Sequence, residues 1–163
     1  MFVFGHLGMG RALVRPWLGP LPWLPLAVGM LLPDLIDKPL YYTHISSFLS
    51  CTRTIGHTAI FAAVLLAVAA LWSSRRGWAL GVGVATHLVL DNVFDAVVGG
   101  GLGSAWIALV WPLYGWDFYR VTFTLGEHAR MLVAVPTVVC EVAGLGLLAW
   151  ERRKSRVTRV RTA

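Results

Sequence analysis

Long apolar segments recur along the chain and are separated by short polar or glycine-rich stretches. Four of them, residues 17–33, 57–72, 78–98 and 131–150, approach the length of about 20 residues that a helix needs to cross a bilayer. A fifth apolar stretch, residues 105–114, is too short to span and fits a re-entrant or interfacial piece. The pattern predicts an all-α, polytopic membrane helix bundle with about four spans.

The composition favours the same class of protein. Hydrophobic residues make up 57% of the 163 residues, charged residues make up 13%, and the mean hydropathy is +0.69. Soluble domains contain about a quarter charged residues, so an ordinary soluble domain is excluded. The length suits one domain, and we expect residues 1–150 to form a single membrane-embedded helical domain.

The net charge is +6, and the basic residues gather near the ends of the predicted spans. Arg11 and Arg15 precede the first span, Arg75 and Arg76 join the second and third, and a basic tail at 151–163 follows the fourth. An even number of spans places all three groups on one side of the membrane. The positive-inside rule makes that side cytoplasmic, which predicts an integral protein of the plasma membrane with a cytoplasmic C-terminus.

The basic tail, residues 151–163, has two interpretations. It is either an anchor on anionic lipid, where each Lys or Arg contributes about 1 kcal/mol, or a solvated and disordered end. The expected partner is thus the lipid bilayer. No nucleic-acid partner is expected, because the basic residues are terminal and no nucleic-acid-binding motif accompanies them.

A histidine and two aspartates lie inside the apolar segment 78–98. His87 and Asp91 are four residues apart and share a face on a helix, and Asp95 continues that stripe by one turn. This pair can bind zinc, with manganese as an alternative, or it can be a polar pair that joins two helices. Ionisable groups are costly inside a membrane and mark function there, so we predict metal binding by His87 and Asp91. Asp95 is expected to be solvated or to support the ligands.

Three further groups of polar residues lie at the edges of apolar segments. Asp34 and Asp37 end the first segment and either join a site or cap a helix end at the water boundary. His57 opens the second segment as a metal ligand or an interfacial residue. Arg53, four residues before it, either holds a phosphate through its guanidinium group or anchors the helix entry. His6, between two nearby glycines, is a weaker candidate by itself.

Five short motifs follow one another in the chain: His6-Leu7 with Gly10, Leu32-Pro33-Asp34, Arg53-Thr54 with His57, His87 with Asp91, and Trp111-Pro112. Their order and rough spacing resemble the family of bacterial membrane-bound metal-dependent hydrolases, which includes a LexA-regulated inner-membrane hydrolase. That family is in turn distantly similar to zinc-dependent phospholipase C and to the single-strand-specific zinc nucleases, which are all-helical. The resemblance implies the bacterial inner membrane as the location.

The same resemblance implies a set of metal ligands. A first metal would be held by four side chains: Asp34, His57, His87 and Asp91. A second metal would lie between His6 and Asp91, with Asp91 as the bridging ligand. The expected cofactor is therefore one or two divalent metal ions, with zinc preferred and manganese as the alternative.

The chain departs from the family pattern at several positions. Two residues separate Asp34 from Asp37, where the family has one, so the role of Asp37 is open. Thr58 replaces the usual serine, and Gly56 replaces a frequent threonine. The later pair of ligands that the soluble enzymes use for a third metal is missing, and a third metal is not expected.

The position of His6 conflicts with the simplest topology. If residues 17–33 cross the membrane once, His6 lies on the opposite side from Asp34. His6 can join the site only if residues 1–16 reach into the membrane or if the proline-rich part of 17–33 folds back. The alternative is that His6 is not a ligand.

The expected activity is metal-dependent hydrolysis of a phosphoester, lipid-derived substrates included. The metal makes hydroxide available at neutral pH, Asp37 or Asp95 orients the water, and Arg53 holds the phosphate. Two alternatives use the same cluster: transport of metal ions or protons through the bilayer, and a non-catalytic protein stapled by a metal.

Overall fold

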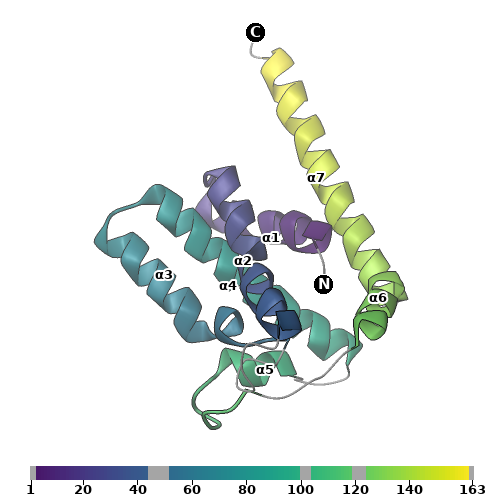
Figure 1. The fold of residues 1–163 in the computed structure, drawn as a ribbon. Helices are drawn as coiled ribbons and strands as arrows, with labels where there is room; N and C mark the ends of the chain where they lie inside the picture. The colour runs from purple at the N-terminus through teal and green to yellow at the C-terminus, as the bar shows by residue number, and fades with distance from the viewer. Residues whose placement is uncertain (1–2, 44–51, 100–103, 119–123, 162–163) are drawn as a thin grey trace.

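The computed structural model describes residues 3–43, 52–99, 104–118 and 124–161, and within them the chain forms helices and no strand. The all-α class expected from the sequence is confirmed. The helices are shown in Figure 1: α1 (Val3–Leu18), α2 (Trp23–Thr43), the short 3₁₀ helix η1 (Ile55–His57), α3 (Ala59–Leu71), α4 (Arg75–Val98), α5 (Ser104–Leu109), α6 (Leu125–Val133) and α7 (Val135–Arg161).

Helix α4 is the centre of the bundle. Helices α1, α2, α3 and α5 all pack against it, whereas α7 packs along α1 and extends beyond the bundle toward the C-terminus (Figure 1). Two buried apolar clusters hold α4 in place: Leu26, Met30 and Ala79 on the α2 side, and Ala62, Val84 and Leu88 on the α3 side.

Two glycines let α2 and α4 approach closely. A Cβ atom at Gly29 would meet the backbone of α4, and one at Gly83 would meet the backbone of Leu26 and Met30. Small residues at a helix crossing allow two backbones to come together, which is common between membrane helices. Gly83 is one turn before His87, so this crossing determines where the polar residues of α4 lie.

The helices differ in length from the four expected spans. Helix α4, with 24 residues, is long and apolar enough to cross a membrane. Leu125–Val133 and Val135–Lys154 would add a second crossing only as one broken span bent by 58°. Helix α3 is apolar but has only 13 residues. Four spans therefore stay a prediction, and the described helices offer one or two candidates.

The segment 17–33 is divided, contrary to the prediction of one apolar span. Helix α1 ends at Leu18 and α2 begins at Trp23 and continues to Thr43. Between them Gly19 has a positive φ of 64°. The prolines at 20 and 22 have no backbone N–H for a continuing helix, so the chain turns back here.

Helix α7 begins at a second break. Pro136 occupies its first turn, where a missing N–H is tolerated, and α6 ends just before it, at Val133. Helix α7 continues to Arg161 and so includes most of the basic segment 151–163, for which the sequence left a lipid anchor and a disordered end as alternatives.

The close crossing of α2 and α4 at Gly29 and Gly83 predicts that a larger residue there destabilises the fold. We expect Gly83→Ala to lower the free energy of unfolding by about 1–3 kcal/mol, because the added methyl group forces α2 away from α4. The control is Gly146→Ala on α7, where a Cβ meets no atom within 4 Å and helix propensity favours alanine by about 1 kcal/mol. Thermal unfolding in detergent measures both, and equal melting temperatures would contradict the close crossing.

Candidate metal centre

Five ionisable side chains from four elements meet at one place in the bundle. His6 comes from α1, Asp34 from α2, His57 from the end of η1, and His87 and Asp91 from α4. The three histidines and Asp91 are at most 5% exposed. Two groups of three satisfy the spacing of a metal site, and His87 belongs to both. The structure thus brings together all five ligands predicted from the sequence.

The imidazole of His87 has a defined tautomer. Its Nδ1 atom lies 2.7 Å from the carbonyl oxygen of Met30 on α2. A carbonyl oxygen only accepts hydrogen bonds, so Nδ1 carries the proton and donates it. In the neutral ring Nε2 then has a free lone pair, which points into the cluster.

His57 is oriented in the same way by a carboxylate. Its Nδ1 atom lies 2.7 Å from Oδ2 of Asp37, which is fully buried. Asp37 also accepts hydrogen bonds from the backbone and hydroxyl of Thr54, at 2.6 and 2.8 Å, and from the backbone of Gly56, at 3.0 Å. These donors fix the carboxylate, and a carboxylate behind a histidine directs the Nε2 lone pair toward a metal.

The two Nε2 atoms of His57 and His87 lie 3.2 Å apart. If both imidazoles donate through Nδ1 and are neutral, two lone pairs face each other at this distance. That arrangement is repulsive in a buried site unless a cation or a proton lies with them. The position between the two rings therefore favours a positive charge.

Two carboxylates complete the surroundings of this position. From Nε2 of His57, Oδ1 of Asp34 lies at 3.8 Å and Oδ2 of Asp91 at 3.6 Å, and from Nε2 of His87 the same Asp91 oxygen lies at 3.9 Å. Zinc bonds of about 2.0–2.1 Å in a tetrahedron separate their ligand atoms by about 3.4 Å. Asp34, His57 and His87 form one group whose ligand atoms all lie within 4.8 Å of one another, and His87 and Asp91 form a second group with His6.

His6 contacts the candidate metal centre through Oδ1 of Asp91 and through the ring of His87. Its ring stacks on that of His87, with centroids 4.1 Å apart and planes at 9°, and its Nε2 lies 3.1 Å from Oδ1 of Asp91. Asp91 thus presents one oxygen to His6 and the other to His57. The chain reversal at 19–22 brings α1 back to the site, so the conflict between His6 and a single crossing of 17–33 does not arise.

The N-terminus of α1 is held by Glu141 of α7. Its two carboxylate oxygens accept hydrogen bonds from the backbone amides of Phe4, at 2.8 Å, and Gly5, at 2.9 Å. A carboxylate on the free amides at the start of a helix stabilises that end. A Cβ at Gly8 would collide with the backbone of Gly144, so α1 and α7 pack closely next to His6. In the sequence, Glu141 lies inside the apolar segment 131–150 and nothing nearby indicates its partner.

Arg53 lies beside the centre and pairs with two aspartates. Its guanidinium group donates to Asp95, at 2.5 and 3.2 Å, and to Oδ2 of Asp91, at 3.0 Å. Burial alone would lower the pKa of Arg53, but the carboxylates of Asp91 and Asp95 outweigh it and raise that pKa above its ordinary value. Arg53 therefore keeps a full positive charge next to the candidate ligands.

Two of the predicted catalytic residues occupy supporting positions. Asp37 faces the Nδ1 side of His57, and Asp95 faces Arg53. Neither contact tests the prediction that one of them orients a water. The contacts that the sequence did not reveal are those of the Met30 carbonyl and of Thr54, because a backbone acceptor and a common hydroxyl carry no pattern of their own.

The family model described as YdjM inner membrane protein matches residues 1–160, nearly the whole chain. The chain belongs to the YdjM inner membrane protein family. No curated protein and no solved structure matches it. The inner-membrane location expected for this YdjM-family chain is thereby confirmed, and α4 is a helix of membrane-spanning length. The resemblance to metal-dependent hydrolases stays a prediction, since the family name states no activity.

The contact between Asp37 and His57 predicts that loss of the Asp37 carboxylate weakens metal binding. We expect Asp37→Asn to weaken zinc binding by about 10- to 100-fold, as is usual when the carboxylate behind a ligand histidine is lost. Competition with a chromogenic chelator measures the affinity, and thermal unfolding checks that the variant folds. The control is Glu127→Gln, which removes an exposed carboxylate of α6. Equal affinities in the two variants would show that Asp37 does not support the site.

Proposed function

We propose that this YdjM-family protein is a metal-dependent hydrolase of the inner membrane that acts on a phosphoester, lipid-derived phosphoesters included. The observation that carries the proposal is the pair of Nε2 atoms of His57 and His87, 3.2 Å apart and both directed at one position. The Nδ1 contacts with Asp37 and the Met30 carbonyl keep the Nδ1 side of each ring outside the cluster, which leaves each Nε2 atom for a metal.

As the resemblance implies, Asp34, His57, His87 and Asp91 would hold the first metal, and His6 and Asp91 would hold the second. The proposal is supported by two groups of closely spaced ligand atoms, Asp34 with His57 and His87, and His6 with His87 and Asp91. Zinc held there would supply a Lewis acid and would lower the pKa of a bound water toward 7, with manganese as the alternative. Asp91 suits the bridging role because its two oxygens face different histidines.

Arg53 favours a phosphoester over other substrates. Its guanidinium group lies on Asp91 and Asp95, and its fork of N–H donors matches phosphate oxygens in the same way. In this proposal Arg53 exchanges part of its contact with Asp95 for a substrate oxygen, and Asp95 keeps the guanidinium in place. A metal site that only joined helices would not need the positive charge of Arg53 beside it.

The main alternative is transport of metal ions or protons through the same cluster. It is supported by the burial of the histidines and by the helix α4, which carries both His87 and Asp91 and is long enough to cross a membrane. A proton between His57 and His87 would relieve the same repulsion as a metal ion.

The first experiment is metal analysis of the purified protein beside the double variant His57→Ala/His87→Ala. We expect about one or two zinc or manganese ions per wild-type chain and none in the variant. Turnover of a phosphodiester and of phospholipids in detergent, with and without chelator, follows. Bound metal without chelator-sensitive turnover would favour transport or a structural metal site. Equal and negligible metal content in both proteins would contradict metal binding at this site.

The position of Arg53 predicts a role of its guanidinium group in turnover. We expect Arg53→Lys to lower kcat/KM for a phosphodiester by about 10- to 100-fold, because lysine keeps the charge and loses the bidentate contact, worth about 1.5–3 kcal/mol. Metal content should not change. Arg76→Lys, on an exposed arginine at the start of α4, is the control and should retain full activity. Unchanged kinetics in Arg53→Lys would remove Arg53 from the site.

A further inference from the structure

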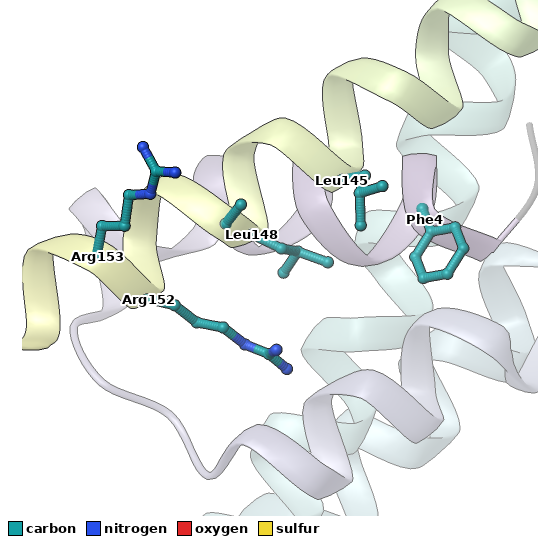
Figure 2. A pocket seen from close by; sticks show the side chains of 6 residues that line it. Phe4, Leu145, Leu148, Arg152 and Arg153 are labelled. Carbon is teal, nitrogen blue, oxygen red and sulfur yellow. The ribbon is translucent and has the colours of Figure 1, made fainter.

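A pocket of about 320 Å³ lies between α1 and the second half of α7, away from the metal centre. Figure 2 shows its lining: Arg153, Arg152, Leu148 and Leu145 follow one another along α7, and Phe4 of α1 lies at the far end. Leu145, Leu148 and Arg152 are three and four residues apart and so share one helix face. The pocket is therefore apolar at one end and basic at the other.

The two arginines differ from the cations around them. Arg11 and Arg15 of α1 both pair with Glu151, and the Lys154 ammonium lies 3.9 Å from the ring centroid of Trp150. Among the residues that the structure describes, by contrast, Arg152 and Arg153 have no ion-pair partner, and both are exposed. The two guanidinium groups point in different directions from α7 (Figure 2), and both side chains line the basic end of the pocket. A basic end and an apolar end match a ligand that is anionic at one end and apolar at the other.

The composition of α7 indicates where this pocket lies relative to the membrane. Residues 135–150 are mainly apolar and many are exposed, among them Val142 at 65% and Trp150 at 54%, whereas residues 151–161 are rich in arginine. Tryptophan is typical of the membrane–water boundary, and arginine beyond it is typical of the headgroup region. This change at 150–151 is the pattern expected of a helix that passes from acyl chains to headgroups, with Leu145 on the acyl-chain side and Arg152 on the headgroup side.

We propose that this pocket binds one anionic glycerophospholipid, with its phosphate on Arg152 and Arg153 and an acyl chain along Leu148, Leu145 and Phe4. The site is separate from the candidate metal centre and does not depend on the proposed hydrolysis. A bound lipid would hold α7 to α1 at the end opposite Glu141, whose contact with Phe4 and Gly5 lies next to His6.

The test is native mass spectrometry of the full chain in detergent, titrated with phosphatidylglycerol and with phosphatidylcholine of the same acyl chains. We expect phosphatidylglycerol to bind at least about tenfold more tightly. The double variant Arg152→Gln/Arg153→Gln should weaken its binding by about 30-fold, which corresponds to the usual contribution of two basic residues at a lipid surface. Leu148→Ser should weaken the binding of both lipids.

The matched control is Lys154→Gln/Arg76→Gln, which removes the same charge from exposed positions outside the pocket lining. It should bind phosphatidylglycerol within about twofold of the wild type, because it leaves both pocket arginines in place, whereas a general effect of surface charge would weaken both double variants equally. Equal loss in the two double variants, or equal affinity for the two lipids, would overturn the proposal. So would full displacement of the lipid by millimolar inorganic phosphate, which would indicate a site for free phosphate. Metal content should be the same in every variant.

Discussion

The close crossing of α2 and α4 is the constraint on which the arrangement of the site depends. Gly29 and Gly83 let the two backbones approach, and one turn later Nδ1 of His87 reaches the carbonyl oxygen of Met30 at 2.7 Å. That contact assigns the proton to Nδ1 and leaves Nε2 free. A wider crossing would leave His87 without an acceptor and would separate α4 from Asp34, so the packing of two apolar helices determines the chemistry of a histidine.

A second set of contacts brings the loop before α3 to the same point. Asp37 receives four hydrogen bonds, from Thr54, Gly56 and His57, and a Cβ at Gly56 would press on Pro33. The buried carboxylate therefore folds residues 54–57 onto α2 and aims His57 at His87. An unpaired buried carboxylate would be costly, and here Oδ1 accepts from Thr54 and Gly56 while Oδ2 accepts from Thr54 and contacts the ligand His57.

Helix α7 is connected to the candidate metal centre through α1. It packs along α1 at Gly144, and its Glu141 accepts hydrogen bonds from the first amides of α1, just before His6. Because α7 contacts the bundle mainly through α1, a lipid in the proposed pocket near Arg152 would contact the helix that supplies His6.

The sequence by itself determined the helical membrane class and the pairing of His87 with Asp91, because composition and a spacing of four residues are local properties of one helix. It also named all five side chains that meet at the centre. Only the tertiary structure decided that α1 turns back to bring in His6, that Asp37 faces His57, and that Glu141 caps α1. Those contacts join residues 20 to 137 positions apart, and they follow from a turn, glycine contacts and backbone acceptors, which leave no periodic pattern in the chain.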